Sequence, residues 1–152
     1  MNRRLTQKTP WHLWAIGVVS LLWHAGGAYD YTMTNMRNEA YLDMAAQGSG
    51  VPVQVIVDYF TSFPIWAHSA WAFGVWGALV GSILLLLRSR YAVVAFVVSL
   101  IGLAVTSIYT FGGNLPPELA SAQNTIFTIA VMLVLLGLML YSRAMVRRGV
   151  LR

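Results

Sequence analysis

Cysteine is absent from the 152 residues of this chain, and charged residues make up only 10% of it. Without cysteine the protein has no disulfide, no cysteine-ligated zinc or iron–sulfur site, and no catalytic thiol. A soluble domain carries about 25% charged residues, whereas 58% of this sequence is hydrophobic. The composition is therefore typical of a membrane protein.

No charged residue interrupts the four longest apolar runs of the chain. These runs cover about residues 11–29, 63–87, 91–111 and 119–141. A helix needs about 20 apolar residues to cross a bilayer, and a segment inside the bilayer must be helical because no water is there to bond its backbone groups. We therefore predict an all-α integral membrane protein, a single four-helix bundle that comprises residues 1–152.

The few charged residues are divided between the two sides of this predicted bundle. Short loops rich in Lys and Arg remain on the cytoplasmic side of a membrane. The basic residues gather before the first run, between the second and third, and after the last: Arg3, Arg4, Lys8, Arg88, Arg90, Arg143, Arg147, Arg148 and Arg152. The acidic residues share the other two connections with Arg37: Asp30, Glu39, Asp43, Asp58 and Glu118. The partition predicts cytoplasmic N and C termini, and the net charge of +5 indicates topology and lipid contact rather than nucleic-acid binding.

The first run has an alternative interpretation as a signal peptide, because basic residues precede it and the small residues 25–28 end it. Its apolar part is close to the length of a membrane span, however, and it contains Trp11, Trp14 and Trp23. We therefore expect a retained first helix.

The longest connection, residues 32–62, is expected outside the membrane. One apolar face recurs there at helical spacing, with charged residues in between: Met33, Met36, Ala40, Tyr41 and Met44. The glycines of residues 48–50 predict a turn, and Pro52 suits the first turn of a second helix. The apolar face of that helix holds Val55, Ile56, Tyr59 and Phe60. We predict two short amphipathic helices on the outer surface.

Polar side chains occur in the outer half of every predicted span, whereas the inner half of the fourth span, residues 131–140, is apolar apart from Gly137, and Leu84 to Leu87 close the second span. This common depth predicts a pocket that is open to the outside and closed toward the cytoplasm. Its expected ligand-binding residues are His24, Tyr31, His68, Trp71, Thr106, Tyr109 and Asn124. Aromatic walls around a few polar groups are typical of small-molecule sites. The alternative is that Ser and Thr in these helices bond only their own backbone or a neighbouring helix.

His24 and His68 are the sharpest candidates in this set. Each lies about five residues inside the predicted outer boundary, so on antiparallel neighbours they are expected at one depth. Two imidazoles can ligate a haem iron or a metal, or bond a quinone carbonyl or a sugar hydroxyl. Alternatively, each bonds water or a backbone carbonyl near the headgroups. We predict no resident cofactor or metal, with haem and quinone as the alternatives.

Small residues recur on the second span at i, i+4, i+7 and i+11, as Ala70, Gly74, Gly77 and Gly81. Such a seam lets another helix approach closely. At about 100° per residue, its centre lies roughly 150° around the helix from His68. The seam and the histidine are therefore not expected to face one bundle centre, which favours association with another membrane subunit or a second copy of the chain.

A family resemblance is carried by two stretches, YTMTNMRNEAYL at residues 31–42 and FPIWAHSAWAFGVWGALVGSILLLLRSRYA at residues 63–92. They resemble a family of small four-helix bacterial membrane proteins that are often labelled sugar transporters. The resemblance covers most of the chain. It implies a four-helix fold in the bacterial inner membrane and gives some support to small-molecule binding, but it assigns no functional residue.

These patterns favour a non-catalytic, multi-pass protein of the bacterial inner membrane. We expect an accessory or binding subunit of a larger membrane complex, whose outward-facing pocket takes a small amphipathic ligand or a lipid. One alternative is a transporter of small molecules such as sugars. Another is a redox subunit in which His24 and His68 hold haem or contact a quinone. The lack of charged residues within the spans disfavours ion-coupled transport, and the apolar inner half disfavours an open channel.

Overall fold

The computed structural model describes residues 9–152, and this part of the chain is all-α, as predicted, without a strand. Arg3, Arg4 and Lys8, which contribute to the predicted topology, lie outside the described residues. Six α-helices follow one another in the described range: α1 (Trp11–Asn35), α2 (Glu39–Ser49), α3 (Val53–Thr61), α4 (Ile65–Leu86), α5 (Ala92–Tyr109) and α6 (Ala122–Arg147). A π-helical turn, Thr110–Asn114, continues α5.

Three of the described helices are long and apolar enough to cross a membrane. They are Ile65–Leu86, Ala92–Asn114 with its π-helical turn, and Ala122–Arg147, with mean hydropathies of 1.8, 2.3 and 2.3. Helix α1 is also long, at 25 residues, but it is not among the three because His12, His24 and Asp30 lower its hydropathy. The chain therefore has the composition and helix lengths of a membrane protein.

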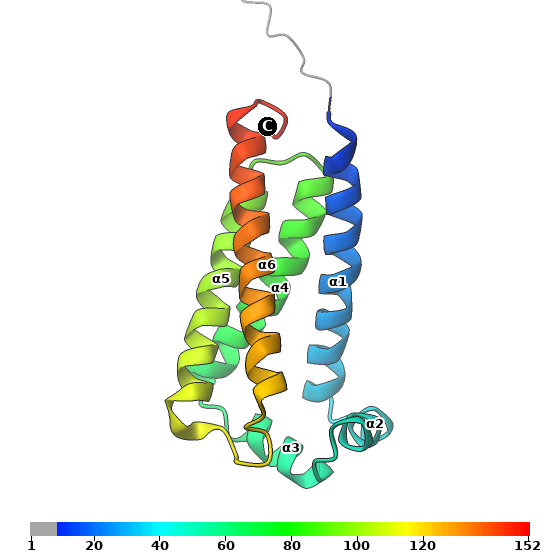
Figure 1. Ribbon diagram of the computed structural model, residues 1–152, viewed down its shortest axis with the longest axis vertical. Coiled ribbons are helices and arrows are strands. Elements are labelled where there is room, and N and C mark those ends of the chain that lie inside the picture. The colour runs from blue at the N-terminus through cyan, green and yellow to red at the C-terminus, as the bar shows by residue number, and fades with distance from the viewer. Residues whose placement is uncertain (1–8) are drawn as a thin grey trace, which may run out of the picture.

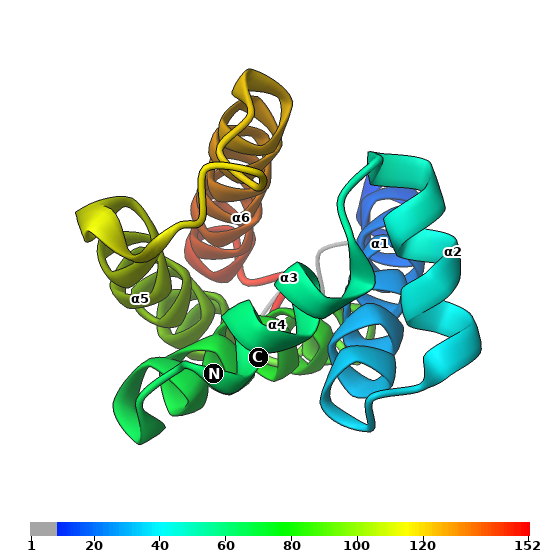
Figure 2. The same cartoon turned by 90° about the horizontal axis from the view of Figure 1, so that it is seen from below.

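The four long helices lie side by side, and α2 and α3 cross one end of them (Figure 1). Seen along the bundle, the order is α1, α4, α5 and α6, which leaves an open side between α1 and α6 (Figure 2). Extensive contacts accordingly join α1 to α4, α4 to α5, and α5 to α6. The bundle is therefore an open arc rather than a closed four-helix ring.

The end of the bundle that carries the arginines is closed by a packed apolar core. Buried residues from all four long helices meet there with the C-terminal tail: Leu13, Leu85, Phe96, Leu138, Met145, Val150 and Leu151. The tail is held by the backbone, since the Arg90 N–H donates to the Arg152 carbonyl at 2.8 Å and the Arg152 N–H donates to the Arg88 carbonyl at 2.9 Å. His12 joins α1 to α6 through its Nδ1, which lies 2.6 Å from the Tyr141 hydroxyl.

The small-residue seam of α4 lies inside the bundle, against α5. A Cβ on Gly77 would come within 3.1 Å of the Ser99 backbone nitrogen, and one on Gly102 would lie 2.5 Å from the Ala70 carbonyl oxygen. Ser99 also crosses this contact, because its hydroxyl donates to the Gly74 carbonyl at 2.5 Å. The seam is therefore occupied by this chain's own α5, and it supplies no argument for a partner subunit.

Both predicted outer helices are present at the other end of the bundle. The Asn38 side chain caps α2 by accepting from the Tyr41 N–H at 3.0 Å, and Gly50 ends it with φ of +69°. Together α2 and α3 form a second apolar cluster around Leu42, Ala46 and Ile56.

The expected apolar face of the first outer helix was partly wrong. Met33 and Met36 do not belong to α2, because α1 continues to Asn35 and the chain turns at Arg37, whose φ is +50°. Met44 is 67% exposed. The face that packs is instead made by Leu42 and Ala46, so α2 is rotated relative to the prediction.

Candidate functional site

A cavity of about 610 Å³ lies on the open side of the bundle. Helices α1, α4, α5 and α6 all contribute to its wall, which is mainly apolar: Leu22, Val75, Ala78, Leu103, Val131 and Leu135. Its polar residues are His24, Asp30, Tyr41, Thr106 and Thr128. Across the open side, the rings of Trp23 on α1 and Phe127 on α6 approach to 6.2 Å between centroids. We call this space the groove.

His24 is the buried polar residue of the groove wall, with only 6% of its surface exposed. Its Nδ1 lies 2.8 Å from the Ser82 hydroxyl oxygen on α4, and its ring packs near Phe96 of α5, with 6.3 Å between centroids. Its Nε2 has no hydrogen-bond partner among the described residues. A buried polar atom without a partner costs free energy. Nε2 is itself covered by neighbouring atoms, so a ligand group in the groove reaches it only when a neighbouring side chain moves.

Asp30 and Tyr41 form the polar end of the groove beside the outer helices. The Tyr41 hydroxyl donates to the Asp30 carboxylate at 2.5 Å, which also ties α2 to α1. Burial and this carboxylate both raise the pKa of Tyr41 above its ordinary value, so the phenol stays neutral and keeps donating. The groove therefore has an apolar body and a polar end.

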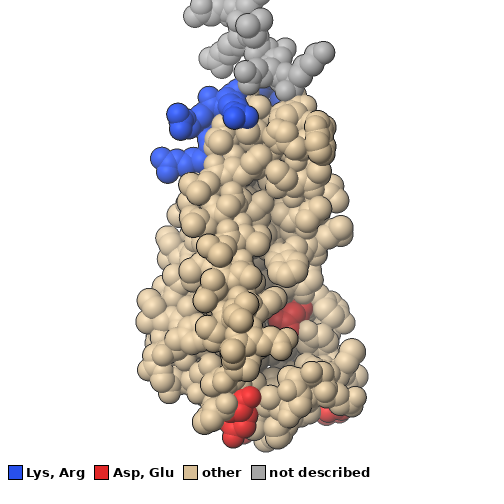
Figure 3. Space-filling model, viewed as in Figure 1, with Lys and Arg blue, Asp and Glu red and all other residues tan. Residues whose placement is uncertain are grey.

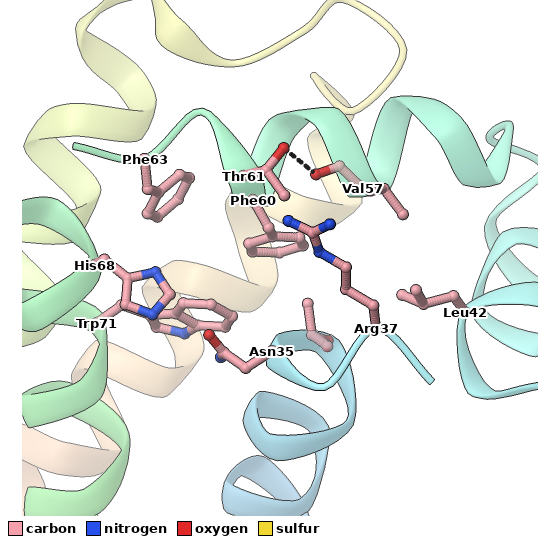
Figure 4. Close-up of a pocket in the computed structure, with 10 residues that line it drawn as sticks. Asn35, Arg37, Leu42, Val57, Phe60, Thr61, Phe63, His68 and Trp71 are labelled. Atoms are coloured by element: carbon pink, nitrogen blue, oxygen red, sulfur yellow. Dashed lines mark hydrogen bonds between the residues drawn. The ribbon is translucent and has the colours of Figure 1, made fainter. Parts of the chain in front are cut away.

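A second, smaller cavity of about 190 Å³ lies beneath α2 and α3 and is shown in Figure 4. His68 and Trp71 line it from α4, Phe60 and Thr61 from α3, and Arg37 from the turn after α1. The Arg37 side chain extends toward α3 (Figure 4). Tyr31 packs beside this cavity, with its ring centroid 4.5 Å from that of Trp71 and 6.3 Å from that of His68.

The expectation that His24 and His68 share one depth is wrong. His24 pairs with Ser82, which lies fourteen residues after His68 on α4, or about 21 Å along a helix. The reason is the length of α1, which continues past residue 29 and places Tyr31, rather than His24, opposite His68. The structure thus separates the single predicted pocket into two cavities, with Trp71 in the wall of both.

The remaining predicted residues divide between the groove and the loops. Thr106 lines the groove. Tyr109 packs on Phe63 and Trp66, and its hydroxyl donates to the Ser62 carbonyl at 3.3 Å. Asn124 is exposed in the first turn of α6 and donates to the Leu119 carbonyl at 2.8 Å. Neither Tyr109 nor Asn124 is part of the wall of these two cavities.

This separation bears on the metal and haem alternatives. Histidine nitrogens bind a metal at about 2.0–2.1 Å. His24 bonds to Ser82, which lies roughly 21 Å along α4 from His68, so the two imidazoles are not placed to ligate one ion. Within residues 9–152, no group of three or more His, Asp and Glu side chains is placed to hold a metal. The haem alternative therefore keeps only one histidine ligand, the Nε2 of His24.

Sequence reasoning did not single out Ser82, Asp30, Tyr41 or Thr128 as parts of the site. Ser82 carried a signal, because it is a polar residue within an otherwise apolar inner half of α4. The other three line the groove only through the way in which α1, α2 and α6 pack.

Comparison of the chain with protein-family models, with curated proteins and with solved structures finds no match.

Proposed function

We propose that the protein crosses the bacterial inner membrane four times, with α1 as the fourth span. The middle of α1 supports this, because Val18 and Val19 face outward, and Val19 is 68% exposed. Large apolar side chains also cover the outside of α4, α5 and α6, so α1 continues a belt that suits lipid. The resemblance to small four-helix bacterial proteins supports the same arrangement.

The charges support an orientation with both termini in the cytoplasm. On the face shown in Figure 3, Lys and Arg gather at the upper end and Asp and Glu toward the lower end. The upper end holds the turn between α4 and α5 and the end of α6, with Arg88, Arg90, Arg147 and Arg152. Basic loops remain inside, which assigns α2, α3 and the polar end of the groove to the outside.

The function proposed for this protein is non-catalytic binding of a small amphipathic ligand or lipid, in an accessory subunit of a larger membrane complex. The observation that carries it is the groove itself, about 610 Å³ with an apolar wall and a few polar groups. This is the usual make-up of a small-molecule site. Its open side faces the predicted lipid, and the core around Leu85 and Met145 closes the arginine end, so entry is expected from the outer leaflet.

Two other functions stay as alternatives. A redox subunit is favoured by one observation, the unpaired Nε2 of His24, and a Soret band in the purified protein would support it over simple binding. A sugar-type transporter agrees with the family resemblance, but the sugar would have to pass the end of the bundle that carries the arginines, which the apolar core closes. Uptake of a labelled sugar into proteoliposomes is the direct measurement.

Filling the groove is expected to abolish binding. Gly27 lines the groove, and a Cβ built on it meets no heavy atom within 4 Å. The Gly27→Phe variant should therefore fold, while its ring occupies the space of the ligand. We expect mass spectrometry of protein purified in mild detergent to find a bound lipid or amphipathic molecule with the wild type, and at least tenfold less with the variant.

The matched control is Gly137→Phe on α6. Its Cβ also meets nothing within 4 Å, but Gly137 does not line the groove. This variant should carry as much ligand as the wild type. Wild-type protein that purifies without any bound molecule, or two variants that retain the same amount, would count against the proposed function.

A further inference from the structure

The contacts around His24 favour one position for its proton. A serine hydroxyl has one hydrogen to donate, and the Ser82 hydroxyl lies 3.0 Å from the Ala78 carbonyl oxygen and 2.8 Å from Nδ1 of His24. Both contacts are hydrogen bonds only if Ser82 donates to the carbonyl and Nδ1 donates to Ser82; if Ser82 donates to Nδ1 instead, the proton is on Nε2. The first arrangement makes the most hydrogen bonds, and it places the hydrogen on Nδ1. In a neutral imidazole the other nitrogen, Nε2, is then a bare acceptor.

The groove wall has no hydroxyl left to satisfy that acceptor. Thr106 donates its hydrogen to the Gly102 carbonyl at 2.8 Å, and Thr128 donates to the Asn124 carbonyl at 2.9 Å. Tyr41 donates to Asp30 at 2.5 Å. Every hydroxyl that lines the groove thus offers lone pairs only, as does the Asp30 carboxylate. The other side-chain donors of the wall are the indole N–H groups of Trp23 and Trp71, and neither is bonded to Nε2. Nε2 therefore needs a donor from another molecule.

A molecule that fits this wall must therefore bring its own hydrogen-bond donor. A positively charged ammonium is disfavoured beside His24, because the surrounding wall is apolar and a charge without a partner there is costly. An ether or ketone offers only lone pairs and leaves Nε2 unpaired. A neutral hydroxyl on an apolar body meets all of these conditions.

We infer that the groove selects amphipathic molecules with a neutral hydroxyl group, which donates to Nε2 of His24. This inference rests on the proposed function and names the chemical class of its ligand. The apolar body of the ligand lies against residues such as Leu103 and Val131, and Ser82 acts as a positioning residue that holds His24 in the accepting form. A quinone carbonyl gains nothing at Nε2, whereas the hydroxyl of a quinol gains a hydrogen bond.

The first test is the protonation of His24 itself. The full chain, labelled with 15N at histidine, is reconstituted in phosphatidylcholine nanodiscs, whose lipids carry no hydroxyl group. The resonances of His24, assigned from their loss in His24→Phe, should show a protonated Nδ1 and a bare Nε2. A proton on Nε2 would overturn the inference before any ligand is added. In Ser82→Ala, where Nδ1 has no acceptor, the two forms should mix.

The second test compares 1-dodecanol with dodecyl methyl ether, which share an apolar chain and differ in the hydroxyl hydrogen. We expect the wild type to bind the alcohol about tenfold more tightly, as one hydrogen bond to a buried, unpaired acceptor implies. Only the alcohol should shift the Nε2 resonance. His24→Phe should bind both probes alike, and Ser82→Ala should show a reduced preference.

The outcomes separate this inference from the proposed function. If the wild type binds both probes equally and the Gly27→Phe variant binds neither, hydroxyl selection is wrong, but the groove is still a binding site. Binding of neither probe, in a protein that also purifies without a bound molecule, would overturn both. If the His24→Phe variant still prefers the alcohol, another group recognises the hydroxyl, and the role inferred for His24 is wrong.

Discussion

Replacing Gly102 with alanine is expected to destabilise the fold by about 3 kcal/mol, at the upper end of the usual cost of overpacking. The added methyl group would lie 2.5 Å from both the Ala70 carbonyl oxygen and the Gly74 backbone nitrogen. These are backbone atoms of α4, which cannot turn aside as a side chain can. Ordinary contacts need about 3.5 Å, so α4 and α5 must move apart by roughly 1 Å. Unfolding followed by circular dichroism in mild detergent measures the effect.

Alanine substitutions at two other glycines serve as comparisons for the loss of stability at Gly102. Gly137→Ala places its methyl group where no heavy atom lies within 4 Å, so stability should stay the same or rise by about 0.5–1 kcal/mol, since alanine favours the helix. Gly77→Ala should fall between the two, because its nearest contact is 3.1 Å. If the Gly102 and Gly137 variants are equally stable, α4 and α5 are not in close contact at Gly102.

The helices of this protein were predictable because their signals are local. Long runs without charge, the glycines near residue 50 and Pro52 are read directly from the sequence, and α3, α4 and α5 occur where these signals indicate. Helix α6 continues six residues beyond the predicted run, to Arg147. The end of α1 was not predictable in the same way. Asp30 and Tyr31 suggest a boundary, yet the helix continues to Asn35 until the positive φ of Arg37 turns the chain.

The candidate site depended on packing that the sequence does not encode locally. Which residue of α4 faces His24 depends on how far α1 is shifted along α4, and the fourteen residues between His68 and Ser82 correspond to about four helical turns. The groove exists because α6 packs on α5 and only touches α1 through contacts such as Trp23 with Phe127 and His12 with Tyr141. Two polar residues of α5 also have different surroundings, since Ser99 bonds to Gly74 while Thr106 lines the groove.

Single cysteines at opposite ends of the bundle are expected to react with an impermeant thiol reagent in an all-or-none manner. The chain has no cysteine of its own, so every signal comes from the introduced residue. Ser49→Cys, at the end of α2, should react in spheroplasts, in which the inner membrane is intact. Ser89→Cys lies between Arg88 and Arg90, in the turn after α4, and should react only after the inner membrane is permeabilised. The physical reason is the retention of basic loops in the cytoplasm.

Thr9→Cys, just before α1, decides whether α1 is a membrane span. If α1 crosses the membrane, this cysteine should be protected in intact cells like Ser89→Cys, although Ser49→Cys reacts. Reaction of all three variants in denatured protein provides the total against which protection is measured, which matters because Ser89 is half-buried. Equal reaction of Thr9→Cys and Ser49→Cys in intact cells would place both ends of α1 on one side and leave three spans. Protection of Ser49→Cys alone would invert the orientation, and the polar end of the groove would then open to the cytoplasm.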